Sequence, residues 1–244
     1  MSDVSCLITS WKRQATLAQQ IEAVKNQSVK PVETVVWQNH VDDRPIDEVA
    51  LAGVTHVRSN KNWGVWPRFL FAMEFSTEYV CIFDDDTIPG SKWLENCLTT
   101  IQSHNGLLGS IGVWFPKGTR LPHHRAGWAT HNEQVRQVDI VGHSWFFRRK
   151  WLRHYALEPR MGGRTWGEDY HFSVAIQKHL GLGTYVPPQP KDKPEMSGSL
   201  RGYELGSGPD SLWEGNIKFQ ADKITESHNL YLKAGWLPMS RRKK

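Results

Sequence analysis

The sequence predicts an α/β domain in which a mostly parallel sheet is flanked by helices. Short apolar stretches of strand length alternate with longer stretches in which apolar residues recur at helical spacing. Such alternation is typical of strands joined by right-handed helical crossovers. The 244 residues suffice for one sizeable core, and no linker or internal repeat divides them. We therefore expect a single domain over residues 1–244.

In the first part of the chain, strands and helices alternate up to residue 83. The predicted elements are strands Val4–Ile8, Glu33–Trp37, Val54–Val57 and Tyr79–Phe83, and helices Gln14–Asn26 and Val65–Phe75. The second helix tolerates Pro67 in its first turn. Its apolar residues share one face at helical spacing. These residues are Trp66, Phe69, Leu70 and Met73.

The remaining chain is expected to complete the sheet and to end in a helix. The predicted elements are a helix that begins at Ser91, a strand Leu107–Trp114, strand pieces Val138–Val141 and Ser144–Phe147, and helices Glu168–Leu180 and Ser211–Leu232. Two segments rich in glycine, proline and charged residues, 116–133 and 191–209, are expected to be loops. The first would lie over the site, and the second is either a lid that closes over bound ligand or a plain surface loop.

The composition indicates a globular protein with reduced cysteines and no membrane span. No apolar segment is long enough to cross a bilayer, and Met1–Asp3 lacks a basic region followed by an apolar one, so a cytoplasmic location is expected. Cys6, Cys81 and Cys97 form no CxxC pair and fit buried thiols. Part of the net charge of +5 lies in the tail Arg241–Lys244, which is expected to be solvated or weakly attracted to a membrane surface. A nucleic-acid partner is not expected.

Three consecutive acids, Asp84–Asp86, follow directly on the apolar strand Tyr79–Phe83. They emerge at the carboxyl end of a strand, where open α/β sheets bind their ligands. Because side chains alternate along an extended backbone, Asp84 and Asp86 can face one crevice while Asp85 points elsewhere. A divalent cation would turn the repulsion between those two carboxylates into coordination. The alternative is a turn whose aspartates cap the following helix.

A second acidic pair, Glu168 and Asp169, lies where a glycine-rich turn becomes a helix. Acids in a first turn are favoured by the helix dipole, so the pair could serve that purpose alone. A carboxylate on a rigid helix start that faced the first acidic cluster could instead accept a proton from a substrate hydroxyl. The adjacent Trp166 offers a flat aromatic face of the kind that stacks on sugar rings. The residues alone leave both interpretations open.

The order of these motifs resembles that of the metal-dependent GT-A glycosyltransferases, particularly family 2. The motifs are a turn bearing Arg13 after the first strand, Asn62–Val65 followed by Arg68, Phe83–Asp86, and Gly167–Asp169. They occupy about residues 3–186 of the chain. The resemblance implies a Rossmann-like nucleotide-binding half over 1–90, an acceptor and catalytic half over 91–210, and a C-terminal helix with a basic tail over 211–244.

The resemblance also implies roles for individual residues. Asp84 and Asp86 would hold Mn²⁺ or Mg²⁺ as a DxD motif. Asp169 would be the catalytic base, and Glu168 beside it would hold the acceptor. The residues implied to bind the nucleotide sugar are Thr9, Ser10, Arg13, Gln38, Asn39, Asn62, Arg68, Asp84 and Asp85. Those implied to form the acceptor or sugar pocket are His143, Ser144, Trp145 and Trp166.

This chain departs from the family pattern at two places. Many members carry an aspartate after the second strand to grip the base, whereas this chain has Gln38–Asn39, which leaves the base open. No histidine clearly matches the third metal ligand that some relatives supply after the Glu-Asp pair. His171 would point away on its helix, so the remaining coordination is expected from diphosphate and water. For His143, a hydrogen-bonded histidine at the edge of a core strand is an equal alternative.

The activity implied by the resemblance is the transfer of a hexosyl or deoxyhexosyl group from a nucleotide sugar, with a UDP-sugar as the expected donor. The acceptor would be a glycan, a lipid-linked molecule or another hydroxyl compound, and inversion is expected. One alternative is a sugar-phosphate nucleotidyltransferase, which would normally carry a glycine-rich loop after the first strand, but Ser10–Gln14 contains no glycine. The other is a non-enzymatic, metal-containing carbohydrate-binding module, which would leave Gly167–Asp169 without a role.

Overall fold

The computed structural model describes residues 3–40, 46, 48–128, 130–206 and 217–242. The strands in this part are β1 (Val4–Ser10), β2 (Glu33–Gln38), β3 (Thr55–Arg58), β4 (Tyr79–Phe83), β5 (Gly106–Trp114), β6 (His124–Gly127), β7 (Arg136–Val138), β8 (Ile140–Arg148) and β9 (Gly183–Val186). They form one sheet of nine strands with the spatial order β3-β2-β1-β4-β8-β5-β9-β7, and β6 pairs with β5. The predicted α/β class is confirmed.

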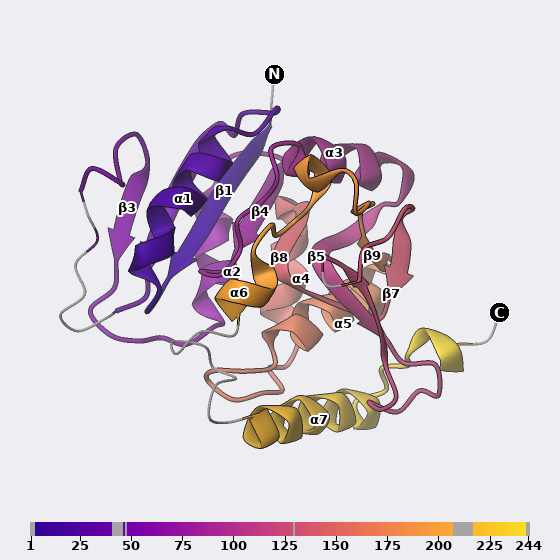
Figure 1. The fold of residues 1–244 in the computed structure, drawn as a ribbon. Helices are drawn as coiled ribbons and strands as arrows, with labels where there is room; N and C mark the ends of the chain where they lie inside the picture. Colours follow the sequence, from indigo (N-terminus) through magenta and orange to yellow (C-terminus); the bar gives the residue numbers. More distant parts are fainter. Residues whose placement is uncertain (1–2, 41–45, 47, 129, 207–216, 243–244) are drawn as a thin grey trace.

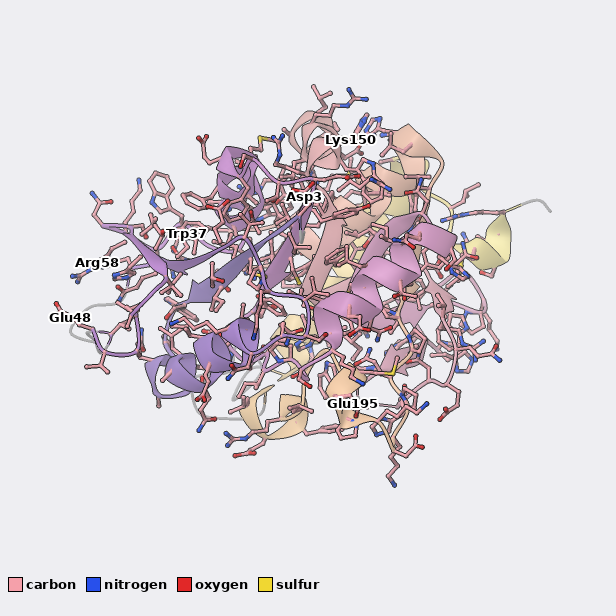
Figure 2. The ribbon with its side chains drawn as sticks, turned by 90° about the horizontal axis from the view of Figure 1, so that it is seen from above. Asp3, Trp37, Glu48, Arg58, Lys150 and Glu195 are labelled. Atoms are coloured by element: carbon pink, nitrogen blue, oxygen red, sulfur yellow. The ribbon has the colours of Figure 1, made fainter. Side chains whose placement is uncertain are left out.

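Helices cover both faces of this sheet. The α-helices are α1 (Gln14–Lys25), α2 (Pro67–Phe71), α3 (Trp93–Ser103), α4 (Leu152–Leu157), α5 (Glu168–Leu180), α6 (Gly202–Gly206) and α7 (Ile217–Lys233), with 3-10 turns at Ala72–Glu74, Arg149–Trp151, Pro194–Met196 and Met239–Arg241. Figure 1 and Figure 2 together show α1 and α3 against one face, and α2, α4 and α5 against the other. In Figure 2, Arg58 and Glu48 lie at the outer β3 edge, far from Lys150 and Glu195.

Strand β8 joins two halves of the sheet that differ in strand direction. β1 pairs in parallel with β2 and β4, and β2 pairs in parallel with β3. β8 runs antiparallel to both β4 and β5, so its first residues lie beside the last residues of β4. The amide nitrogen of Asp84 accordingly donates to the carbonyl oxygen of His143 at 3.1 Å. The sheet is therefore parallel as predicted in its first half and mixed beyond β4.

Most strongly periodic segments form the elements that their sequence predicts. β4 and α5 begin and end at the predicted residues, and α1 ends one residue earlier than predicted. The second predicted helix is shorter than expected, because α2 passes into a 3-10 turn at Ala72–Glu74. Leu70, which was expected on the same face as Trp66 and Phe69, is 46% exposed, whereas those two residues are buried.

The predicted loop 116–133 is wrong in part, because it contains β6. β6 pairs antiparallel with β5, from Ile111 opposite Gly127 to Trp114 opposite His124. The first two residues of β6 are exposed, so the segment lacks the apolar pattern that marks a strand in the sequence. The two predicted pieces Val138–Val141 and Ser144–Phe147 fall mainly in one strand, β8.

Helix α7 is fixed to the body of the protein by a small second core. The buried members of this core are Phe115, Ile140, Tyr170, Val174, Tyr231 and Trp236. A hydrogen bond of 3.0 Å between the Tyr231 hydroxyl and Nδ1 of His171 also joins α7 to α5. Figure 1 shows α7 passing beside the start of α5. The start of the predicted final helix, residues 211–216, lies outside the described part of the chain.

The described part of the predicted loop 191–209 is held by backbone hydrogen bonds. Gly90 N donates to Ser197 O at 2.8 Å, and Leu200 N donates to Ile88 O at the same distance. These bonds tie the segment to the residues that precede α3. Residues 191–206 are therefore an ordered part of the fold, which disagrees with a free surface loop over that range.

The described part of the basic tail also folds back. Arg242 Nε donates to Leu237 O at 2.9 Å, and the Arg241 side chain lies against Gly118. Both arginines contact the protein, although Arg241 remains exposed and Arg242 is only half-buried. No described helix has the length and apolar character needed to cross a bilayer. The three cysteines are buried free thiols, as predicted.

We expect Phe69→Ala to lower the free energy of unfolding by about 3–5 kcal/mol, because it empties a fully buried site. The Phe69 ring contacts Trp145 and Phe172 edge-to-face, with centroid distances of 5.1 and 5.4 Å. Urea unfolding monitored by tryptophan fluorescence measures the loss. The neighbouring Leu70→Ala, at an exposed position, should cost less than about 1 kcal/mol. Equal losses in the two variants would contradict the assigned inner face of α2.

Candidate active site

The carboxyl ends of β1, β2 and β4 surround a cavity of about 250 Å³ together with residues of β8 and the start of α5. Most of the site residues predicted from the sequence line it. They are Thr9, Ser10, Arg13, Asn39, Asn62, Arg68, Asp84, Asp85, Asp86, His143, Trp166, Glu168 and Asp169. The two acidic clusters, which are far apart in the sequence, therefore converge on one cavity.

Two arginines balance the charge of the first acidic cluster. Arg13, in the turn between β1 and α1, donates from Nη1 to Asp85 Oδ1 at 2.6 Å and to Asp86 Oδ2 at 3.2 Å. Arg68 of α2 forms an ion pair with Asp84. The alternative role of these acids as helix caps is wrong, because no side chain caps the start of α3.

His143 joins the first acidic cluster because β8 carries a bulge at this position. The pairing between β5 and β8 shifts, so that His143 and Ser144 together face one residue of β5. His143 adopts a φ of +64°, in the left-handed region. Its carbonyl oxygen accepts a hydrogen bond of 2.9 Å from Thr87 Oγ1. Its Nδ1 lies 3.7 Å from Asp86 Oδ1, so the bulge aims the imidazole at the acids.

Asp84, Asp86 and His143 each offer one ligand atom, and these three atoms lie within 4.8 Å of one another. Carboxylate oxygens suit Mg²⁺ and Mn²⁺, and an imidazole nitrogen suits first-row transition metals. The set therefore fits Mn²⁺ well, and the third protein ligand comes from a residue that the sequence analysis assigned to the sugar pocket. His171 points away as predicted, because its Nδ1 bonds to the Tyr231 hydroxyl.

The acids of this cluster differ in their ionisation. Burial opposes the charge of Asp86, but the hydrogen bond and charge of His143, together with Arg13, hold the pKa of Asp86 below its usual value. Burial also opposes a charged His143, yet Asp86 raises the pKa of that imidazole to about 9. Burial and the charge of Asp86 raise the pKa of Asp85 to about 6. Arg13, Arg68 and a protonated His143 thus balance much of the negative charge of this cluster.

Asp169, the second residue of α5, lies across the cavity. Its Oδ1 is buried and has no hydrogen-bond partner among the described residues. A Cβ at Gly142 would lie only 3.0 Å from that oxygen, so any residue larger than glycine would crowd the carboxylate. Burial raises the pKa of Asp169 well above its usual value, and the charges of Glu168 and Asp84 raise it further. A carboxylate with this environment is suited to accept a proton.

Arg68 links the two acidic clusters. Its side chain is buried, and its guanidinium lies 5.5 Å from the centre of the Trp145 ring. Burial opposes its positive charge, but Asp84, Glu168 and Asp169 raise its pKa. One buried cation therefore serves both clusters, which limits the repulsion between them.

The wall formed by the end of β2 and the following loop is held by side-chain amides. Asn39 Nδ2 donates to Asn62 Oδ1 and to Gly64 O, both at 3.1 Å, and Asn39 Oδ1 accepts from Trp63 N at 2.9 Å. Both amide hydrogens of Asn39 are therefore used within the protein. Gly64 has a φ of +80°, and a Cβ there would lie 2.0 Å from Arg164 O, so this turn requires glycine.

The β1 side of the cavity offers one free hydroxyl and two aromatic rings. Ser10 Oγ is buried and lacks a hydrogen-bond partner among the described residues, whereas Thr9 Oγ1 donates to Phe83 O at 3.0 Å. Trp11 and Trp37 also line the cavity, although the sequence analysis selected neither. Their positions at or just after the carboxyl ends of β1 and β2 were the signal that could have identified them.

Three residues predicted for the site do not line this cavity. Gln38 is buried at the end of β2, where its Oε1 lies 3.1 Å from His56 Nε2. Ser144 and Trp145 are fully buried in β8. The bulge turns His143 into the cavity and leaves its two successors within the core, so their assignment to the sugar pocket is wrong.

The sequence matches the model of glycosyl transferase family 2 over residues 5–156. The chain belongs to this family. The matched residues include the strand and acids of the first cluster and the bulge at His143, and they end before Asp169. This result confirms the family resemblance found in the sequence. None of the curated protein sequences matches this chain.

Solved structures of other glycosyltransferases share its fold. The mannosyltransferase PcManGT from Pyrobaculum calidifontis, in complex with GDP-Man and Mn²⁺, has a TM-score of 0.65 at 15% identity, over 97% of this chain and 66% of its own. Residues 1–349 of TarS from S. aureus, in complex with UDP, have a TM-score of 0.56 at 15% identity, over 77% of this chain and 58% of their own. The chain thus spans less than two thirds of either neighbour.

We expect His143→Gly to weaken Mn²⁺ binding at least about tenfold, because it removes one ligand while glycine adopts the left-handed backbone without strain. Isothermal titration of the purified protein with Mn²⁺ measures the loss. His131→Gly is a matched control, since His131 is exposed, has a φ of +56° and lies outside this cluster. Unchanged Mn²⁺ affinity in His143→Gly would remove the imidazole from the ligand set.

We expect Asp169→Asn to raise the melting temperature by a few degrees near pH 7. The folded state raises the pKa of Asp169, whereas the unfolded chain leaves it near ~3.9. The folded state therefore holds more protons between these two values, and this carboxyl contributes less stability as the pH rises through that window. Thermal melts from pH 4 to 8 should show the advantage of the variant growing with pH. A constant difference would refute the assigned burial of this charge.

Proposed function

We propose that this protein transfers a glycosyl group from a nucleoside-diphosphate sugar to a hydroxyl acceptor, with Mn²⁺ or Mg²⁺ bound at the first acidic cluster. The observation that carries this proposal is that the unpartnered oxygen of Asp169 belongs to a carboxylate that shares one cavity with Asp84, Asp86 and His143. Family membership supports glycosyl transfer. PcManGT holds GDP-Man and Mn²⁺, and TarS holds UDP, in the same fold.

The donor would lie on the side of β1 and β4. Asp84, Asp86 and His143 would hold the cation, which supplies positive charge to the departing diphosphate. Arg13 is placed to add a second positive charge, because its guanidinium already reaches Asp85 and Asp86. We propose a UDP-sugar with a hexosyl or deoxyhexosyl group. The free hydroxyl of Ser10 and the ring of Trp11 are proposed to contact its nucleoside.

The acceptor would lie on the side of α5. Asp169 would take the proton of the acceptor hydroxyl while that oxygen forms a bond with the anomeric carbon and the bond from this carbon to the diphosphate oxygen breaks. The attacking oxygen would approach from the side of α5, and the leaving group would depart toward Asp84 and Asp86. Attack and departure on opposite faces invert the anomeric configuration. Glu168 is proposed to orient the acceptor.

Neither alternative accounts for the site as well. A sugar-phosphate nucleotidyltransferase needs a phosphate-cradling loop after β1, and Ser10–Gln14 contains no glycine. A carbohydrate-binding module gives no reason for a buried carboxylate oxygen without a partner at Asp169, which costs free energy in the absence of chemistry.

We expect Asp86→Asn and Asp169→Asn each to lower the rate of transfer at least about 100-fold, for different reasons. Asp86→Asn should also abolish the rise in melting temperature produced by nucleoside diphosphate and Mn²⁺ together, because the cation loses a ligand. Asp169→Asn should keep that rise, because the carboxylate does not touch the donor diphosphate. Wild-type protein screened with uridine, guanosine, cytidine, thymidine and adenosine diphosphates identifies the nucleotide.

The exposed Asp192→Asn makes the same chemical change outside the cavity and should alter neither readout. If no diphosphate raises the wild-type melting temperature in the presence of Mn²⁺, the proposed donor class is wrong. Normal transfer by Asp169→Asn would show that another group is the base.

A further inference from the structure

A second cavity, of about 160 Å³, adjoins the first across Asp169. Four residues line both cavities: His143, Gly167, Asp169 and Ile224. The remaining walls of the second cavity come from β5, the segment that leads to β6, the start of β8 and the inner side of α7. A molecule in this cavity therefore reaches the proposed base from the side opposite the nucleotide residues Thr9, Ser10 and Arg13, which line only the first cavity.

The charge of the second cavity is opposite to that of the first. Arg120, His123 and Arg125 line it, whereas Asp169 is its only carboxylate among the residues described. Among the residues that the structure describes, no carboxylate oxygen forms an ion pair within 4.0 Å of Arg120 or Arg125. Arg120 acts electrostatically on Tyr170, so its charge lies close to the start of α5. The cavity thus holds two guanidiniums without a counter-ion from the described chain.

The histidine between these arginines is arranged to stay neutral. Arg125 Nε donates to His123 Nε2 at 3.3 Å, which requires that nitrogen to be unprotonated. Burial, Arg125 and Arg120 lower the pKa of His123. The His123 imidazole therefore positions one guanidinium without adding charge, and the positive charge of the cavity comes from Arg120, Arg125 and His143.

A polar atom without a partner marks the same cavity from the side of α7. Ser227 is 1% exposed and lines the cavity, and its Oγ has no hydrogen-bond partner among the described residues. A buried hydroxyl without a partner costs free energy, so a bound molecule that accepts or donates a hydrogen bond here would recover it. Ser227 Oγ and Asp169 Oδ1 are both buried oxygens without a hydrogen-bond partner among the described residues, and both residues line this cavity.

We propose that the second cavity is the acceptor site and that the acceptor carries an anionic group, a phosphate or a carboxylate, held by Arg120 and Arg125. This inference rests on the proposed function of the first cavity. Guanidinium groups bind both anions through paired hydrogen bonds. The cavity volume of about 160 Å³ is enough for a small charged unit near the reacting hydroxyl.

The test compares three sugars that differ in charge: glucose, glucose 6-phosphate and glucuronate. Each is titrated into wild-type protein that is saturated with nucleoside diphosphate and Mn²⁺, which keeps the phosphorylated probe out of the donor site, and binding is measured by thermal shift. At least one anionic sugar should bind about tenfold more tightly than glucose. Preference for the phosphate or for the carboxylate identifies the anionic group.

Variants assign the effect to the cavity. Arg120→Gln and Arg125→Gln should each weaken binding of the anionic sugar about tenfold and leave glucose unchanged. Arg120→Lys keeps the charge but not the planar fork, so an intermediate loss is expected. Arg58→Gln is the matched control, because Arg58 is exposed at the distant β3 edge (Figure 2) and should have no effect. The rise in melting temperature with diphosphate and Mn²⁺ should stay the same in all four variants.

The inference is overturned if glucose binds as tightly as both anionic sugars, or if Arg120→Gln and Arg125→Gln leave their binding unchanged. The same titration without nucleotide separates this result from failure of the proposed function. If diphosphate and Mn²⁺ do not bind, the donor assignment fails, while anion binding that depends on Arg120 and Arg125 would still establish the second site.

Discussion

The site depends on the charge balance that lets two acidic segments share one end of the sheet. Without positive charge nearby, Asp84–Asp86 and Glu168–Asp169 would repel one another strongly, because water screens buried carboxylates poorly. Arg13 binds one side of the first segment, Arg68 lies between the two, and His143 adds a third positive group. These cations offset the repulsion among the carboxylates and so allow the two acidic segments to lie close together.

The arrangement follows from the direction of one strand. Because β8 runs antiparallel to β4, its early residues reach the carboxyl end of β4, where the acids are. The bulge then places His143 in the cavity and Gly142 under Asp169. A side chain at Gly142 would press on the Asp169 carboxylate, and a regular strand would turn the imidazole elsewhere. Gly142 and His143, two neighbouring residues of β8, thus set the geometry around Asp169 and around the first acidic cluster.

The sequence predicted the elements with strong periodicity and the residues that lie at their ends. Val80 to Phe83 are wholly apolar and buried, and the acids that follow could be placed at the sheet edge on that basis alone. The role of His143 could not be predicted, because a bulge depends on pairing between β5 and β8 rather than on a local pattern. Ser144 and Trp145 were misplaced for the same reason. β6 was not predicted, because its first two residues are exposed and the segment shows no apolar pattern.

The two cavities differ in the charge of the residues that line them. The first contains the acids and therefore favours a donor that arrives with a cation, whereas the second contains Arg120 and Arg125 and favours an anion without one. A bare anion would be repelled by the acids of the first cavity and attracted by Arg120 and Arg125 of the second. This difference in charge would favour the proposed donor on one side of Asp169 and the proposed anionic acceptor on the other. Asp169 lines both cavities, so the proposed acceptor hydroxyl would reach this carboxylate from the side of Arg120 and Arg125, opposite the proposed nucleotide residues.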